Sequence, residues 1–117
     1  MAGAQITLTI PPRAEFLRLV RLASADVGSR VGLDYEEIDD LKIAASELCS
    51  LVLESGDSLT LVFTLEDDTV TIDGAASLCV LSENEISRAI ISAVVDEYEI
   101  RDVGDKTQFR LMKRHRT

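Results

Sequence analysis

The spacing of apolar residues limits the fold of this chain more than any other feature, because it switches between the period of a strand and that of a helix. Apolar and polar residues alternate, as in half-buried strands, over residues 5–10, 58–65, 69–73 and 107–112. Apolar residues recur every three or four positions, as in helices with one apolar stripe, over residues 13–32, 34–55 and 82–98. These patterns predict the order strand, helix, helix, strand, strand, helix, strand.

Two of the expected helices begin at a recognisable cap. Asp34 with Glu37, and Ser82 with Glu85, have the spacing of a capping box, in which two side chains bond free N–H groups of the first turn. Strands with one apolar and one polar face suit a sheet that helices cover on one side only. We therefore expect a single α/β domain over residues 1–117, a two-layer sandwich whose mixed, mainly antiparallel sheet carries its helices on one face.

The charge balance of the chain opposes one class of partner. Twelve basic residues stand against 21 acidic ones, which gives a net charge of −9. Nucleic-acid binders gain affinity from clustered Lys and Arg, so no nucleic-acid partner is expected. The one basic cluster, residues 113–116, is interpreted as a solvated C-terminus, with contact to an acidic partner as the alternative.

The sequence lacks the residues that several kinds of site require. Cys49 and Cys79 lie 30 positions apart without a CxxC pair, so both are expected to be free buried thiols. His115 is the only histidine, which excludes a histidine metal cluster and a Ser/His/Asp relay. No apolar run approaches the roughly 20 residues of a membrane helix, and no signal pattern begins the chain. We expect no metal, no membrane partner and a cytoplasmic location.

Several framework segments together are similar to one known family. They are Ile10 with Pro11, and residues 17–21, 40–49, 95–100 and 107–113. Through them the chain resembles the ATP-binding domain of the anti-sigma factor serine kinases, which are bacterial regulators. The resemblance implies the fold of histidine-kinase and gyrase ATPase domains, here with a shortened lid, and framework positions speak for fold more than for chemistry.

The resemblance also implies a nucleotide and magnesium site, and this chain departs from the family pattern there. The family's second helix carries a catalytic Glu and, four residues later, an Asn that holds magnesium; here Glu47 is kept and Leu51 replaces the Asn. Magnesium requires oxygen ligands, which leucine does not have. The family's adenine-reading Asp-x-Gly-x-Gly box keeps its Asp and loses both glycines in the run Asp73, Gly74, Ala75, Ala76 and Ser77.

The phosphate-binding part of the family site is altered as well. A flexible lid and a Gly-x-Gly turn hold phosphates in the family, whereas residues 82–85 of this chain read Ser-Glu-Asn-Glu and place two carboxylates there. Thr107 is the remaining position that the resemblance assigns to nucleotide binding. Phosphoryl transfer depends on positioning and charge neutralisation, so we interpret the site as vestigial and expect neither ATP nor magnesium as a cofactor.

The retained residues each have a plainer interpretation. Glu47 is either a surviving acid or an ordinary solvated or paired glutamate. Asp73 either still reads adenine or only ends its strand and starts a turn at Gly74. Leu51 is expected to fill the vacated pocket with help from the shortened loop, residues 78 and 80. The acidic residues between positions 34 and 40 either meet a basic partner or stabilise a helix N-terminus.

Two functions remain open at this point. The first is a non-catalytic regulator of transcription, a pseudokinase that binds a sigma factor or an anti-anti-sigma antagonist. Arg18 and Arg21 are its candidate contacts, because the family meets its partners there; the alternative is a solvated helix face. The second is an active or nucleotide-sensing serine/threonine protein kinase with Glu47 as the acid and Asp73 as the adenine reader. The resemblance also makes a homodimer plausible.

Overall fold

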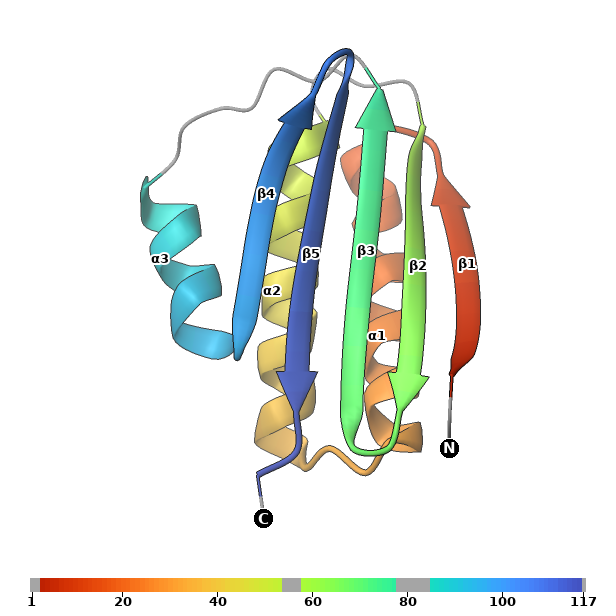
Figure 1. Cartoon of the computed structure of the whole chain (residues 1–117), viewed down its shortest axis with the longest axis vertical. Helices are drawn as coiled ribbons and strands as arrows, with labels where there is room; N and C mark the ends of the chain where they lie inside the picture. The colour runs from red at the N-terminus through yellow and green to blue at the C-terminus, as the bar shows by residue number, and fades with distance from the viewer. Residues whose placement is uncertain (1–2, 54–57, 78–84, 117) are drawn as a thin grey trace.

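The computed structural model describes residues 3–53, 58–77 and 85–116. Its five strands form one sheet in the order β1-β2-β3-β5-β4, in which every neighbouring pair is antiparallel. The helices lie on one face of this sheet and leave the other face open (Figure 1). The elements are β1 (Ala4–Ile10), the short helix η1 (Ala14–Phe16), α1 (Leu17–Arg30), α2 (Tyr35–Leu53), β2 (Leu59–Glu66), β3 (Thr69–Ser77), α3 (Glu85–Val94), β4 (Glu97–Val103) and β5 (Lys106–Arg114).

The expected two-layer sandwich is confirmed, and so is the first capping box. The backbone N–H of Glu37 donates to Asp34 Oδ1 over 2.9 Å, and the backbone N–H of Asp34 donates to Glu37 Oε1 over 2.8 Å. This reciprocal pair satisfies two donors that the first turn of α2 would leave free. The second box at Ser82 lies outside the described residues.

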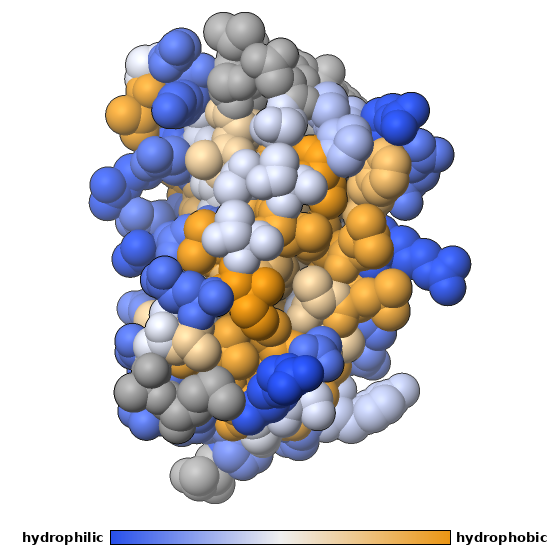
Figure 2. Space-filling model, turned by 90° about the vertical axis from the view of Figure 1, so that its right-hand side faces the viewer, coloured by the Kyte–Doolittle hydropathy of each residue, from blue (hydrophilic) through white to orange (hydrophobic). Residues whose placement is uncertain are grey.

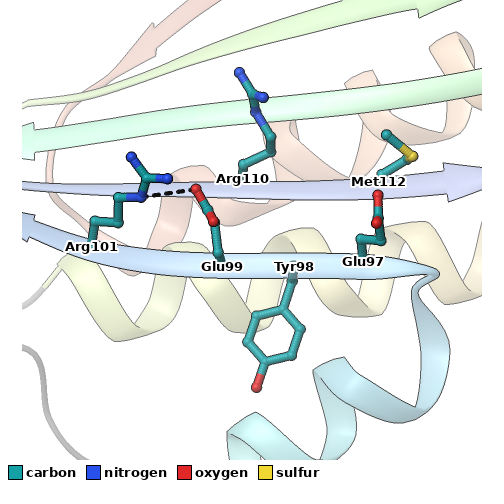
Figure 3. A pocket seen from close by; sticks show the side chains of 6 residues that line it. All are labelled: Glu97, Tyr98, Glu99, Arg101, Arg110 and Met112. Atoms are coloured by element: carbon teal, nitrogen blue, oxygen red, sulfur yellow. Dashed lines mark ion pairs between the residues drawn. The ribbon is translucent and has the colours of Figure 1, made fainter.

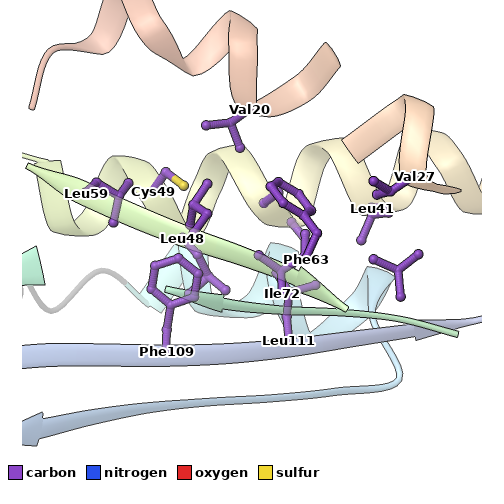
Figure 4. Packing of buried hydrophobic residues seen from close by; sticks show 14 of the residues in the cluster. Val20, Val27, Leu41, Leu48, Cys49, Leu59, Phe63, Ile72, Phe109 and Leu111 are labelled. Atoms are coloured by element: carbon purple, nitrogen blue, oxygen red, sulfur yellow. The ribbon is translucent and has the colours of Figure 1, made fainter. Parts of the chain in front are cut away.

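The core lies between the sheet and the two long helices. Figure 4 shows its centre, where Val20 and Val27 of α1 and Leu41 and Leu48 of α2 meet inward-facing strand residues such as Phe63. The Cys49 thiol is free and buried among these side chains, and burial raises its pKa to about 12. Cys79 lies outside the described residues.

Strand β3 is longer than its alternation predicts. Asp73 does not end the strand and Gly74 does not start a turn, because β3 continues to Ser77 in register with β2 and β5. Gly74 lies opposite Phe109, and a Cβ on Gly74 would stand 2.2 Å from that ring. A glycine is therefore required here for a close contact and not for a turn.

The chain between α3 and β5 also differs from expectation. Helix α3 ends at Val94, and Tyr98 belongs to a fifth strand, β4, which pairs with β5. The apolar residues at positions 94, 95 and 98 continue the helical spacing, while Tyr98 and Ile100 also fit an alternation. Pairing with β5 across the short turn at residues 104–105 selects the strand.

The basic tail is bound to the domain and is not a solvated end. Lys113 is only 3% exposed, and its Nζ donates to Asp40 Oδ2 over 3.2 Å and to the Val94 carbonyl over 2.7 Å. The tail then follows the first turn of α2, where His115 and the Arg116 backbone reach the carboxylate of Glu37. Figure 1 shows the C-terminus at this end of α2. The acidic start of α2 thus meets a basic segment of its own chain.

None of the helices within residues 3–53, 58–77 and 85–116 is both long enough and apolar enough to span a bilayer.

Candidate functional site

The C-terminal half of α2 carries the first two residues that the resemblance assigns to a site. Glu47 and Leu51 are one turn apart, so they share a face of the helix. Leu51 is 8% exposed and belongs to the hydrophobic core, while Glu47 is half-buried and forms no ion pair with any other described residue. Leu51 is therefore part of the apolar core. Residues 78 and 80, expected to help it, lie outside the described part of the chain.

Asp73 lies on the other side of the sheet. The neighbouring Ile72 side chain is fully buried on the helix-covered face, so the Asp73 side chain points to the open face. There the Arg110 guanidinium donates from Nε to Asp73 Oδ1 over 2.6 Å. This hydrogen bond and the charge of Asp73 raise the pKa of Arg110. The structure thus does not bring Asp73 together with Glu47, because the sheet separates them.

The rest of the altered glycine box lies along the seam between β3 and β5. Gly74 is buried beneath Phe109, Ala75 is half-buried on the open face, and Ser77 ends the strand. Thr107 is fully buried and is the cross-strand partner of Ala76. The fold therefore places Thr107 beside the box, although the two are about 30 residues apart in sequence.

Arg18 and Arg21 are three residues apart on α1, and so are neighbours on its surface. Arg18 is exposed and Arg21 is half-buried. Neither forms an ion pair with another residue in the described ranges, in contrast to Arg30, which bonds Asp26 over 2.6 Å, and to Arg110. In a chain of net charge −9, two neighbouring guanidiniums without a carboxylate partner are suited to acidic groups of another molecule.

Sequence reasoning missed a shallow cavity of about 500 Å³ on the open sheet face. Figure 3 shows Glu97, Glu99, Arg101 and Arg110 turned toward this face, while Tyr98 points to the opposite side. The Arg101 Nε lies 3.0 Å from Glu99 Oε1, and Arg110 is held by Asp73, so both cavity guanidiniums already have carboxylate partners. The cavity was missed because the expected helix ran to Tyr98 and no strand was expected over residues 99–103; the alternation at residues 97–101 was the available signal.

One cluster has the ligand types of a metal site. Oxygen or nitrogen atoms of Asp34, Glu37 and His115 lie within 4.8 Å of one another. Both oxygens of Glu37 already accept hydrogen bonds, one from the Asp34 N–H and the other from the Arg116 N–H. His115 Nδ1 lies 2.7 Å from Glu37 Oε1. These contacts account for the cluster as an attachment of the tail to α2.

Comparison with known proteins identifies the relatives of this chain. Serine-protein kinase RsbW of Bacillus cereus strain B4264 is 37% identical over 76 residues, which are 61% of this chain and 48% of that protein. Serine-protein kinase RsbW of Halalkalibacterium halodurans is 26% identical over 122 residues, covering 83% of this chain and 75% of the relative. The chain spans about half the length of the Bacillus cereus relatives. No protein-family model matches it.

A solved structure agrees in fold. The crystal structure of the RsbU and RsbW domains of Rv1364c from Mycobacterium tuberculosis matches 95% of this chain and 32% of that one, with a TM-score of 0.77 and 20% sequence identity. At this identity the match concerns the fold alone. Taken with the sequence relatives, it confirms the resemblance: the chain is a homologue of the RsbW anti-sigma factor serine kinases.

Proposed function

We propose that this chain is a non-catalytic regulator of transcription that binds a protein partner and has lost the nucleotide and magnesium site of its relatives. The observation that carries the proposal is the ion pair between Asp73 and Arg110 on the open face of the sheet. An Asp that reads adenine needs a free carboxylate oxygen turned toward the nucleotide. Here the hydrogen bond from Arg110 Nε to Oδ1, at 2.6 Å, holds the Asp73 carboxylate on the side of the sheet away from α2 and Glu47.

The lost magnesium ligand supports the same proposal. Magnesium binds oxygen atoms in near-octahedral geometry, and the side chain at the family's ligand position is the buried Leu51. Insertion of a hydrated cation beside Leu51 would cost the burial of that side chain and would leave the ion short of a ligand. Glu47, the acid of the family, would then have no phosphate to act on.

A protein partner is supported by the surface of α1. Arg18 and Arg21 form a basic pair, with no ion-pair partner among residues 3–53, 58–77 and 85–116, on an otherwise acidic protein. Arginine forms planar, bidentate contacts with carboxylates and is enriched at the centres of interfaces. We propose that this pair binds an acidic surface on a sigma factor or an anti-anti-sigma antagonist in the cytoplasm.

A thermal melt tests the loss of the site directly. A ligand that binds only the folded state stabilises it by about 2.7 kcal/mol at a hundredfold excess over Kd, which moves the midpoint of a domain this size by several degrees. We expect no shift with millimolar ATP or ADP and magnesium. A magnesium-dependent shift, together with transfer of phosphate to a serine that Glu47→Ala abolishes, would instead establish the serine/threonine kinase function.

The partner contact needs its own experiment. Candidate sigma factors and antagonists from the source organism would be purified and titrated against the chain by calorimetry. We expect Arg18→Ala with Arg21→Ala to weaken the binding about tenfold or more, since interface arginines often contribute over 1 kcal/mol each. The matched control is Arg88→Ala with Arg101→Ala, which removes the same charge from α3 and β4. Equal effects of both double variants would indicate only a long-range charge effect.

A further inference from the structure

Helix α3 has more apolar surface than the domain covers. Its apolar residues, together with Ser87, fill an arc of about 200° around the helix axis at roughly 100° per residue. Ser87 and Ile91 are buried on the part of this arc that packs against the domain, where α3 contacts α2 and β4. The rest of the arc is an exposed stripe of four apolar side chains, Ile86, Ala89, Ile90 and Ala93. Ile86 is 75% exposed and Ile90 is 36% exposed.

The spacing of the exposed stripe suits contact with another helix. Its residues stand at positions i, i+3, i+4 and i+7 of α3, which is the repeat by which one helix packs against a second. The two alanines have small side chains, so a second helix could approach closely between the isoleucines. The stripe follows the whole of α3, which is about 15 Å long at roughly 1.5 Å per residue.

The charges around the exposed stripe favour a basic occupant. Glu85 lies one helical turn before Ala89, and Asp96 lies two residues beyond the last turn of α3. Both carboxylates are exposed, and neither forms an ion pair with another residue of the described ranges. Arg88 is the one basic residue of α3, and it lies about 150° from the middle of the stripe at roughly 100° per residue. Lys or Arg at the ends of an apolar helix would therefore be attracted.

The same charges disfavour pairing of α3 with a second copy of itself. An antiparallel pair would bring Glu85 toward Asp96, and a parallel pair would bring two copies of Glu85 together, with no basic residue in the stripe to offset either contact. A homodimer at the opposite edge of the sheet, where hydrophobic side chains gather on the side of β1 and α1 (Figure 2), would leave the stripe uncovered. Helix α3 lies beyond β4, at the far side of the molecule from β1 (Figure 1).

We propose that the exposed stripe of α3 binds an amphipathic helix of a protein partner. The apolar face of this helix covers Ile86 and Ile90, and its Lys or Arg residues lie beside Glu85 and Asp96. Burial of the apolar side chains supplies the affinity, and the charges at the two ends set the position of the helix along α3. This inference rests on the proposed function only in that the chain binds a protein.

The probe for the test is a labelled peptide amide of sequence Lys-Lys-Leu-Ala-Lys-Leu-Leu-Lys-Ala-Leu-Lys-Lys. Its leucines form one helical stripe, and the control is a peptide of the same composition whose leucines are spread around the helix. Binding to the full chain is followed by fluorescence anisotropy, and amide hydrogen exchange locates the site. We expect saturable binding of the first peptide with slower exchange over residues 85–94, and at least tenfold weaker binding of the control.

Matched variants separate the apolar contact from the general attraction of a basic peptide to an acidic protein. Ile86→Lys is expected to weaken binding about tenfold, the loss of one buried Ile contact. Tyr35→Lys adds the same charge at an 81% exposed position at the start of α2, and it is expected to change binding less than twofold.

A second pair of variants tests the charges. Glu85→Gln with Asp96→Asn is expected to weaken binding severalfold at low salt, because it removes both carboxylates beside the exposed stripe. Glu66→Gln with Asp67→Asn removes the same charge at exposed positions of the turn after β2, and it is the control. Equal effects of the two double variants would contradict the assigned position of the basic residues.

Four further outcomes would overturn the inference. Equal binding to the Ile86→Lys and Tyr35→Lys variants would exclude the exposed stripe. Equal binding of the two peptides would indicate only a charge effect. Exchange protection confined to residues outside 85–94 would place the peptide elsewhere. Sedimentation showing that Ile86→Lys dissociates an oligomer of the chain would assign the stripe to a second copy.

The inference and the proposed function can fail separately. If a partner binds through Arg18 and Arg21 while the peptide does not bind α3, the proposed function stands without this inference. If the chain responds to ATP and magnesium in thermal melts and the peptide still binds over residues 85–94, the inference stands without the proposed loss of the nucleotide site.

Discussion

His115 Nδ1 lies 2.7 Å from Glu37 Oε1, joining the end of the chain to the first turn of α2. Burial alone would raise the pKa of Glu37, but hydrogen bonds from the Asp34 N–H, from His115 and from the Arg116 N–H outweigh it and lower that pKa to about 2. The hydrogen bond to Glu37 in turn raises the pKa of His115 above its usual 6.5, aided by the charges of Glu37, Asp34 and Asp68. One buried carboxylate therefore caps a helix and fastens the tail.

This pair predicts a pH window for stability. Because the folded pKa of Glu37 lies below 4.5, its contribution is present above pH 4.5 and is lost as the pH falls toward 2. Because the folded pKa of His115 is raised, its contribution is complete below pH 6.5 and is lost as the pH rises through the raised value. Urea unfolding across pH should show the largest contribution of the pair between pH 4.5 and 6.5.

The His115→Gln variant isolates the histidine in that measurement. Its free energy of unfolding should fall below that of the unmodified chain at pH 5.5, and the difference should shrink as the pH rises past the raised pKa of His115. Two parallel curves from pH 5 to 9 would show that the ring does not gain its proton through Glu37.

Lys113→Met should destabilise the domain by about 2–3 kcal/mol, because it leaves Asp40 and the carbonyl at the end of α3 without their buried donor. Lys106→Met, on an exposed position of the same strand, is the matched control and should change the stability by less than about 0.5 kcal/mol. Chemical denaturation gives both values. Faster hydrogen exchange in α3 of the Lys113 variant would further support its attachment through this side chain, whereas equal losses in both variants would contradict it.

Gly74→Ala should cost about 3 kcal/mol, because the added Cβ would stand 2.2 Å from Phe109 Cζ in the middle of a paired strand. Combination with Phe109→Leu should cost less than the sum of the two single variants, since the smaller side chain relieves the overlap. Thermal and urea unfolding would reveal the coupling. Additive costs would mean that the ring does not lie against Gly74.

Asp73→Asn should change the stability by at most about 1 kcal/mol, because its partner Arg110 is 61% exposed and the pair is screened by water. If the adenine site is lost, the variant should also leave the response of the melting temperature to ATP and magnesium unchanged. A response that is present in the original chain and absent in Asp73→Asn would assign Asp73 to the nucleotide. The stability change and the ligand response are measured in the same thermal melts.

Some features of the fold are local and could be predicted from the order of residues. The alternation in β1 and β2 and the helical repeat of α1 and α2 depend only on which side chains lie a few positions apart. The capping box of Asp34 and Glu37 spans three residues, so its spacing alone identified it. The framework segments likewise identified the relatives before any geometry was known.

The remaining features depend on pairing and packing that the spacing of residues does not reveal. Residues 97 and 98 fit a helix or a strand, and pairing with β5 across the turn at residues 104–105 selected the strand. The register of β3 with β5 sets Asp73 opposite Arg110, 37 residues later, and both side chains lie on the open face of the sheet. Asp73 is therefore separated from Glu47, which lies on α2 on the other side of the sheet. The sequence alone predicts that Lys113 is a solvated charge, whereas in the fold its Nζ binds Asp40 and the carbonyl at the end of α3. Periodicity describes neighbours along the chain, whereas burial, register and the pKa values of paired groups are set by neighbours in space, which only the tertiary structure provides.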